Sequence, residues 1–191
     1  MDLQRRLILN AGAAAAAAAL TGTSAHAAGT IATTTPAATG KPGDFNFLAG
    51  SWKVSHRRLK QRWVAAKEWD TFEGEATCWT VLAGAASIEE LRVPARGFSG
   101  LGIRLLDVNK HLWADYWVSS RDGVLTPPPM WGGFENGVGT FVADDVDDGL
   151  PIKARGIWDR ITPKSCRWHQ TASRDGGKTW EENWFMDWVR A

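Results

Sequence analysis

The chain contains 191 residues, of which 22 are basic, 21 are acidic and only two are cysteine. A charge so nearly balanced argues against nucleic acid or an anionic membrane surface as the partner, because both attract strongly basic proteins. Twelve tryptophans accompany a single tyrosine, and all twelve lie in residues 52–188. Each indole brings a large apolar area and one N–H donor. A fold this rich in indole either fills a wide core or surrounds a flat apolar ligand.

The first 27 residues have the three parts of an export signal. Arg5 and Arg6 precede an apolar, alanine-rich stretch over residues 7–20, and Ala25-His26-Ala27 offers small residues for cleavage. Paired arginines followed by apolar residues resemble a twin-arginine signal. Neither this stretch nor any later one reaches the length of about 18 apolar residues that a spanning helix requires. We therefore expect residues 1–27 to be removed, the mature protein to be periplasmic, and no segment to span a membrane.

Residues 28–43 are mainly Thr, Ala, Pro and Gly, a composition that predicts a flexible linker. Residues 44–191 then form one domain, which is long enough for a core of its own. Cys78 and Cys166 fall within this domain. An oxidising compartment permits a disulfide between them, but two cysteines define no spacing pattern. The sequence is compatible both with a disulfide between the two cysteines and with two buried, unpaired thiols.

Short runs rich in aromatic and β-branched residues dominate the domain, and turn residues follow each run. Asn136-Gly137 between two such runs is a strong hairpin signal, because both turn positions need a positive φ. No part of the domain shows a convincing helical period with caps. We expect strands over residues 52–59, 69–81, 86–93, 98–107, 112–118, 131–135, 138–142, 152–161, 166–172 and 180–190.

Strands at this spacing without helices form a sandwich or a barrel. Consecutive hairpins and the volume that the indoles require both favour the barrel. The sequence therefore predicts an all-β fold, a single antiparallel β-barrel of about eight to ten strands.

Residues 173–180 read Ser-Arg-Asp-Gly-Gly-Lys-Thr-Trp and match the Asp-box pattern S-x-D-x-G-x-T-W. In this β-hairpin turn the aspartate, here Asp175, accepts hydrogen bonds from turn amides. The pattern occurs in full only here, whereas a propeller needs one structural repeat for each blade. We expect a structural role for this turn.

The domain opens with Phe45-Asn46-Phe47-Leu48-Ala49-Gly50-Ser51-Trp52-Lys53-Val54, in which Gly-x-Trp introduces the first expected strand. This stretch resembles the opening of an uncharacterised family of exported bacterial lipocalin-like proteins of the calycin type. Residues 113–117, 173–180 and 184–187 fit the same family. The resemblance implies a lipocalin-like antiparallel barrel that is closed at the Trp52 end, and it implies no activity.

A candidate site follows from the alternation of side chains in a barrel, where every second residue of a strand faces the interior. An inward Trp52 brings His56 and Arg58 inward along the same strand. Indoles on five further strands would surround one cavity, in which His56 and Arg58 could orient the polar end of a ligand. The predicted ligand-binding residues are His56, Arg58, Trp117, Trp131, Trp158, Trp168 and Trp184.

Signatures of metal, phosphate or nucleophile chemistry are missing from the sequence. No two histidines have ligand spacing, and neither cysteine lies in a C-x-x-C pair. The acidic run at residues 144–149 departs from a calcium loop, because Val146 occupies a ligand position. The glycine-rich residues 97–102 lack the strand–turn–helix of a nucleophile elbow. We expect no metal, no cofactor and no assignable catalytic residue.

The sequence favours an exported soluble barrel that binds a small apolar or amphipathic molecule in a Trp-lined cavity. Two alternatives stay open. A cofactor-free isomerase or lyase would use the same cavity, with His56 or a buried carboxylate as the acid or base. A structural or interaction module would instead fill its interior completely and expose indoles on its outer face.

Overall fold

The computed structural model describes residues 38–125 and 127–191. The export signal expected at residues 1–27 and the linker residues 28–37 lie outside this described part. Within it, no helix has the length and apolar character needed to cross a membrane.

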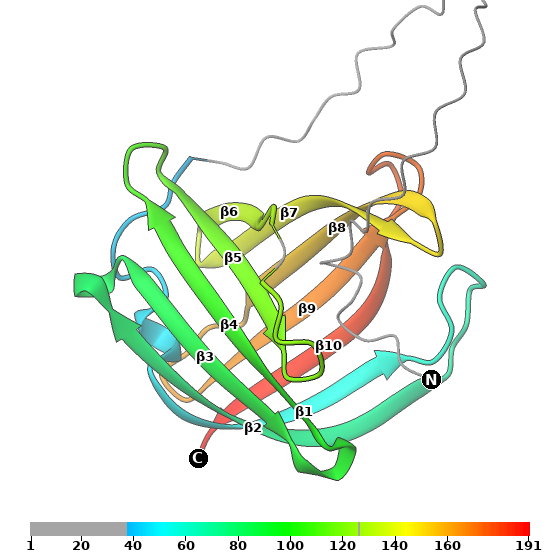
Figure 1. The fold of residues 1–191 in the computed structure, drawn as a ribbon, viewed down its shortest axis with the longest axis horizontal. Coiled ribbons are helices and arrows are strands. Elements are labelled where there is room, and N and C mark those ends of the chain that lie inside the picture. Colours follow the sequence, from blue (N-terminus) through cyan, green and yellow to red (C-terminus); the bar gives the residue numbers. More distant parts are fainter. Residues whose placement is uncertain (1–37, 126) are drawn as a thin grey trace, which may run out of the picture.

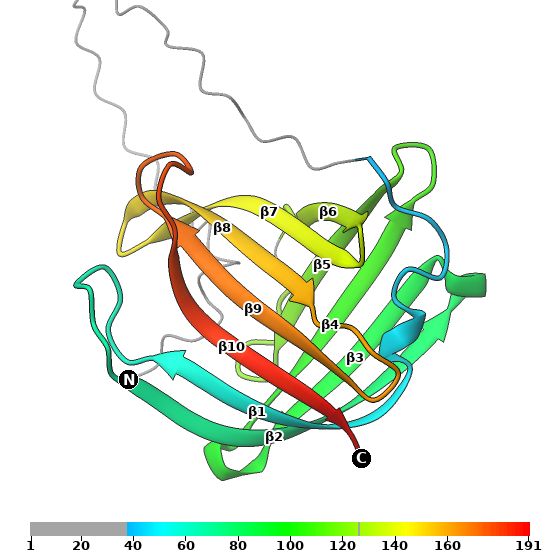
Figure 2. The ribbon, with the colours of Figure 1, turned by 180° about the vertical axis from the view of Figure 1, so that it is seen from behind.

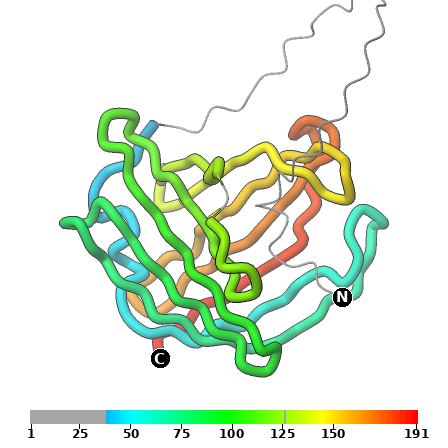
Figure 3. The backbone as a smooth tube through the Cα atoms, in the orientation of Figure 1, coloured from blue at the N-terminus to red at the C-terminus, as the bar shows by residue number. Residues whose placement is uncertain are grey.

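The described chain folds into one closed barrel of ten antiparallel strands (Figures 1 and 2). Each strand pairs with its neighbours in the sequence, and the last strand returns to pair with the first. Figure 3 shows the same course as a run of consecutive hairpins. The predicted single all-β barrel is confirmed. The strands are β1 (Gly50–Leu59), β2 (Trp69–Val81), β3 (Ala86–Val93), β4 (Phe98–Asp107), β5 (Leu112–Ser119), β6 (Met130–Glu135), β7 (Val138–Asp147), β8 (Leu150–Asp159), β9 (Ser165–Ser173) and β10 (Glu181–Arg190).

The two-residue period of a strand divides interior from exterior. In β1, Trp52, Val54 and His56 are buried, whereas the intervening Lys53 and Ser55 are exposed. The same alternation continues through β8, where every second residue from position 152 to 158 is buried. Apolar residues at alternate positions therefore form the core inside the barrel.

One end of the barrel is closed by the 3₁₀ turn η2 (Asn46–Leu48). Trp52 Nε1 donates a hydrogen bond of 2.7 Å to the Leu48 carbonyl. The Arg190 guanidinium lies 4.0 Å from the centre of the Trp52 ring and donates to the carbonyls of Phe47 and Ala49. These bonds satisfy turn carbonyls that would otherwise be left without partners at the barrel end. The closure at the Trp52 end that the resemblance implied is present.

The segment before η2 inserts an aromatic side chain into this end of the barrel. The Phe45 ring lies 4.9 Å from the Trp113 ring and 5.0 Å from the Phe134 ring, both edge to face. Trp113 Nε1 donates to the Asp44 carboxylate at 3.0 Å. Phe45 thereby plugs the closed end and packs with the deepest indoles of the core.

Inward-facing glycines make room for the largest rings. A Cβ added to Gly100 would lie 1.9 Å from the Trp117 ring, and one added to Gly139 would lie 2.6 Å from the Phe134 ring. A side chain at either position would force the facing ring to move. Because glycine has no side chain, the indole or phenyl ring that faces it fills the space, and the interior stays closely packed.

The Asp-box residues form the turn between β9 and β10, as the sequence predicted. The Asp175 carboxylate accepts from the backbone N–H groups of Lys178 and Thr179 and from the Thr179 hydroxyl. These hydrogen bonds from the Thr179 hydroxyl and amide, with one from Ser173, hold the pKa of Asp175 well below its ordinary value. The turn has the structural role expected of it.

A register shift between Glu182 and Trp184 changes the face of the residues before it. Trp184 is buried inside the barrel, whereas Trp180 lies under the Arg155 guanidinium at 3.7 Å. Without this bulge, Trp180 and Trp184 would face the same side of β10. Their four-residue spacing therefore does not reveal their different positions.

Cys78 and Cys166 are free, buried thiols on β2 and β9. The strands β1 and β10 lie between them in the barrel, so the disulfide alternative is not formed. Burial, and then the charge of Glu89, raises the pKa of both thiols, to about 12 for Cys166. Thiols that stay protonated are poor nucleophiles, so both residues act as small apolar core groups.

Replacing Gly100 with alanine should lower the free energy of unfolding by about 1–3 kcal/mol, because the new methyl group would overlap the Trp117 ring. Gly156→Ala is the matched control, since its Cβ would first meet the Trp168 Nε1 atom at 3.1 Å and requires only a small shift. Urea denaturation should rank wild type first, Gly156→Ala second and Gly100→Ala last. Equal stability of the two variants would contradict the close packing of Trp117 on Gly100.

Candidate functional site

The end of the barrel opposite η2 is bounded by the loops that follow β1, β3, β5, β7 and β9, and we name it the mouth. Below the mouth, His56 lies between two aromatic rings. Its imidazole stacks on Phe72 at 4.5 Å between ring centres, and its Nδ1 atom accepts a hydrogen bond of 3.3 Å from Trp184 Nε1. Because Nδ1 accepts, the neutral imidazole carries its proton on Nε2. A Cβ on Gly74 would lie 3.0 Å from that atom, so this glycine also makes space for the ring.

Three more rings continue this lining around the interior. Trp168 meets Trp184 edge to face at 6.1 Å, and Trp117 lies 6.3 Å from Phe98. These rings come from β9, β10, β5 and β4, and the register places Phe72 of β2 directly opposite His56 of β1. Aromatic side chains therefore line the mouth-side half of the barrel on several of its strands.

The indoles of the barrel differ in burial according to their depth. Near the mouth, Trp117, Trp168 and Trp184 are 5–6% exposed, whereas Trp113, Trp158 and Trp188 towards the closed end are at most 1% exposed. Phe72 and Phe98 are half-buried although both face inward. An inward ring can retain accessible surface only where it borders space inside the barrel or at its end. All six indoles belong to one buried core, in which Trp117, Trp168 and Trp184 keep the small exposed area that remains.

Five of the seven predicted ligand-binding residues lie together in this half. His56, Trp117, Trp168 and Trp184 are buried there, and the half-buried Arg58 places its guanidinium 5.5 Å from the Trp184 ring. The β1–β10 register pairs Arg58 with Trp184. The alternation of side chains along the strands thus places all five on the inward face of the barrel.

Trp158 and Trp131 lie elsewhere. Trp158 faces inward but packs at the closed end, 5.5 Å from Trp188 and 6.4 Å from the Phe45 plug. Trp131 lies on the outer face, where Lys110 approaches its ring at 5.2 Å. The inward orientation expected of Trp131 is wrong, because β5 pairs its inward Trp113 with Gly132 and so turns residue 131 outward.

Several inward residues of this region were missed from the sequence. Phe72 was not predicted because Trp69 and Trp79 dominate the pattern of its strand. Phe98 was not predicted because it stands in a glycine-rich stretch. Their signal is parity, since Phe72 alternates with Glu73 and Glu75, which face outward. Gln170 lies two residues after Trp168 in β9, so the same alternation predicts that it faces inward.

A buried ion pair separates the mouth-side half from the plug. Glu89 and Arg104 are almost fully buried and are joined by a contact of 2.5 Å, and Asp115 lies 3.5 Å from Arg104 Nε. The guanidinium also covers the Phe45 ring at 5.2 Å. Burial alone would lower the pKa of Arg104, but the carboxylates of Asp115 and Glu89 raise it above its ordinary value. Arg104 therefore stays charged inside the barrel.

The loop over residues 60–68 joins β1 to β2 and lies beside the β7–β8 turn in both views (Figures 1 and 2). We name it the strap, because its Trp63 packs on Ile152 and Ala172 across the mouth. The Trp63 backbone N–H donates to Glu181 at 2.9 Å. Arg174 covers the other side of the indole at 4.2 Å. One aromatic side chain thus ties the first hairpin to three distant strands.

Acidic residues hold the strap from below. The buried Asp147 carboxylate accepts from Trp63 Nε1 and pairs with Arg62 at 3.0 Å. Asp145, two residues earlier, has its pKa raised from 3.8 to about 7, because burial and then the charge of Asp147 disfavour its ionised form. The strap is therefore attached through Asp147, and the Asp145 carboxyl lies two residues from that attachment point.

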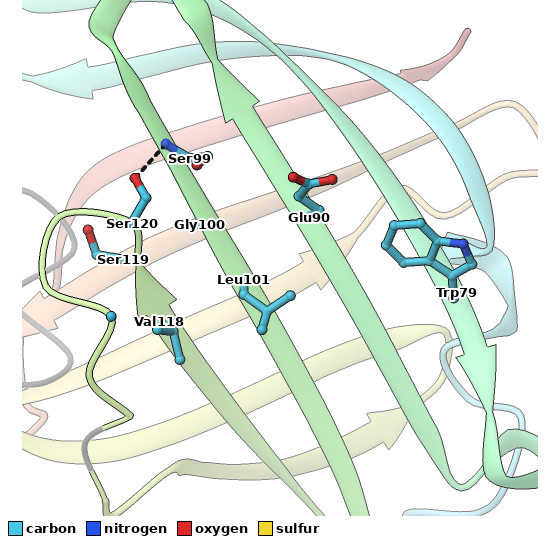
Figure 4. A pocket seen from close by; sticks show the side chains of 9 residues that line it. Trp79, Glu90, Ser99, Gly100, Leu101, Val118, Ser119 and Ser120 are labelled. Carbon is cyan, nitrogen blue, oxygen red and sulfur yellow. Dashed lines mark hydrogen bonds between the residues drawn. The ribbon is translucent and has the colours of Figure 1, made fainter.

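A depression of about 370 Å³ lies on the outer wall, away from the interior. Its floor includes Glu90, Leu101 and Val118, which the register places side by side on β3, β4 and β5 (Figure 4). These positions alternate with the inward Gly100 and Trp117, so the depression opens to the exterior. It is separate from the candidate site.

The described residues contain no group of three His, Cys, Asp or Glu side chains arranged as metal ligands. The candidate site is thus an aromatic surface with a histidine, an arginine and buried amides. Such a set can enclose a flat apolar body and orient a polar group on it.

Comparisons with known proteins assign no family. No family model and no curated protein matches the sequence. Among solved structures, the chain is similar to a protein of unknown function from the DUF3598 family of Nostoc punctiforme PCC 73102, with a TM-score of 0.48 and 12% sequence identity. The match covers 83% of this chain and 53% of that one, so this chain spans about half the length of that protein.

Replacing Glu89 with leucine should lower the free energy of unfolding by about 3–5 kcal/mol, because Arg104 then remains buried without its nearest carboxylate. Adding Arg104→Met to this variant should recover much of the loss, since the buried cation is removed as well. Chemical denaturation of the three proteins measures both effects. A Glu89→Leu variant within about 1 kcal/mol of wild type would contradict the burial of this pair.

Stability should depend on the protonation of Asp145. A carboxyl whose pKa is raised in the folded state favours folding when protonated, so stability should fall as the pH rises from about 4 to about 7. Asp145→Asn removes this titration and should melt at a higher temperature than wild type at about pH 8, with no such gain at about pH 4. Asp144→Asn is the matched control, because its exposed carboxylate pairs with Lys153. A gain for Asp145→Asn that is independent of pH would refute the raised pKa.

Proposed function

We propose that this protein binds a small, flat, apolar or amphipathic molecule in the mouth-side half of its barrel. The observation that carries the proposal is the difference in burial between the two sets of inward indoles. The closed-end set is completely covered by protein, whereas Trp117, Trp168 and Trp184 keep accessible surface although they face inward. Accessible aromatic surface inside a barrel is a favourable environment for a flat ligand.

The chemistry of the lining supports a ligand with an apolar body and one polar end. Indole and phenyl rings provide stacking faces, and the carboxylates of Asp147 and Glu181 at the mouth are engaged by the strap. Arg58 lies above this level, 5.5 Å from the Trp184 ring and 6.0 Å from the Phe72 ring. Arg96 covers the mouth side of Phe72 at 4.9 Å and pairs with Asp70. A ligand that inserts its apolar end first would keep its polar end near these rim residues.

The closed end favours binding from one direction. Phe45, the Glu89–Arg104 pair and η2 fill the barrel beneath the site. The strap crosses the mouth over the ends of β7 to β10, which leaves the side of β2 to β5 as the proposed entrance. The strap would then form one wall of the entrance and not a complete cover.

The test is a titration of the mature protein with apolar dyes, fatty acids, haem and polyphenols, followed by tryptophan fluorescence and melting temperature. We expect saturable quenching and a higher melting temperature for at least one class. Trp168→Leu should weaken that binding by about 2- to 13-fold or more, which corresponds to the 0.5–1.5 kcal/mol typical of one aromatic stacking contact.

Trp131→Leu is the matched control, because Trp131 lies on the outer face of the same barrel. It should bind with the affinity of the wild type. Equal weakening by both substitutions would place the ligand elsewhere. No quenching and no thermal shift across the panel would favour the alternative of a structural module with a filled core.

A further inference from the structure

Two buried amide side chains meet inside the aromatic lining. Gln170 of β9 and Asn183 of β10 are each only 2% exposed. The Gln170 Nε2 group donates to Asn183 Oδ1 at 3.1 Å. Within the described part of the chain, Gln170 Oε1 and Asn183 Nδ2 have no hydrogen-bond partner. The pair therefore presents one acceptor and one donor that the protein itself leaves unused.

This surplus does not depend on how the amides are turned. If both side chains rotate by a half-turn about their last bond, Asn183 donates to Gln170 and the roles are exchanged. One amide oxygen and one NH₂ group still remain. Two amides joined by a single hydrogen bond always leave a donor beside an acceptor.

The backbone places both amides inside the barrel. Gln170 lies on the inward face of β9, with Gly156 and Trp184 as its register partners on the two adjacent strands. Asn183 falls in the bulge of β10, where no residue of β9 pairs with it. The bulge interrupts the regular in–out alternation of β10, so Asn183 faces the interior and reaches Gln170. Trp168 and Trp184 flank the pair on the two strands that carry it.

A packing role alone gives no reason for this pair. Buried polar groups without partners cost free energy, and apolar residues of similar size would avoid that cost. The surrounding side chains are mainly aromatic, so an aliphatic pair would fit this environment. A ligand that supplies the missing donor and acceptor accounts for both amides.

We propose that Gln170 and Asn183 are the polar recognition point of the site, and that the ligand carries an adjacent donor and acceptor on its flat apolar body. A primary or cyclic amide has this pattern, as does a protonated carboxylic acid. The ligand is neutral at this point, because two buried amides do not compensate a full charge. This inference rests on the proposed function, since it names the chemical class that the same site prefers.

Three probes of nearly equal shape test it: 2-naphthamide, 2-acetylnaphthalene and 2-isopropenylnaphthalene. The first offers a donor and an acceptor, the second only an acceptor, and the third neither. Calorimetric titration of the wild type should give an affinity for 2-naphthamide at least about tenfold above that for 2-isopropenylnaphthalene, with the ketone between them. The Gln170→Leu/Asn183→Leu variant should reduce this preference to less than about threefold while it still binds the hydrocarbon.

Two further variants complete the experiment. Asn183→Asp keeps the shape of the side chain and, at a pH high enough to ionise the new carboxyl, replaces a donor with an acceptor, so under that condition it should also lower the preference even if the double variant does not fold. Thr171→Val is the control, because Thr171 is a buried polar neighbour of Gln170 with the opposite, outward parity. It should leave the preference unchanged.

The outcomes separate the two proposals. If none of the three probes binds to the wild type, the proposed function is refuted for this class of ligand and the inference fails with it. If all three bind with equal affinity, the aromatic site stands and the recognition role of the amides is refuted. A preference for 2-naphthamide that survives both Gln170→Leu/Asn183→Leu and Asn183→Asp would also refute that role.

Discussion

The two-residue period of strands in a closed sheet decides which way each side chain of the described strands faces. Because each strand is paired on both sides, a residue faces either solvent or a common interior, and its neighbour faces the opposite way. The position of a residue along its strand then determines how far its side chain lies from the mouth of the barrel. Trp113 and Trp117 share the inward face of β5, but the first packs against the Phe45 plug and the second lies near the mouth.

The two halves of the barrel bury polar groups of different kinds. Towards the plug, Arg104 is enclosed by Glu89 and Asp115, so the charges are compensated within the protein. Nearer the mouth, Gln170 and Asn183 share one hydrogen bond and leave a donor and an acceptor unused. The first arrangement stabilises a fixed core only as a complete set. We propose that the second arrangement, with the aromatic surface around it, receives a ligand.

Local irregularities determine which residues join the site. The bulge in β10 brings Asn183 beside Gln170 and separates Trp180 from Trp184. Inward glycines such as Gly74 and Gly100 leave the volume that His56 and Trp117 occupy. Each of these features changes one position in a regular strand. Together they create an interior that a uniform alternation of large residues would have overfilled.

The sequence by itself determined the strands and the hairpin turns, because these depend on neighbouring residues, whereas the closure at the Trp52 end was implied by the resemblance. Period-two patterns, Asn136-Gly137 and the Asp175 turn are all local, and parity along β1 was enough to group His56 and Arg58 with Trp52. The export signal over residues 1–27 lies outside the described residues and stays a prediction.

Only the tertiary structure decided the register between strands and the depth of each ring. Trp131 faces outward because β5 pairs Trp113 with Gly132, and Trp158 lies in the core because Phe45 enters from outside the sheet. The contact of Trp63 with Asp147 joins the strap to the end of β7, which is far away in the sequence. Such pairings depend on the closure of the whole barrel, and no short stretch of sequence contains the partner that fixes them.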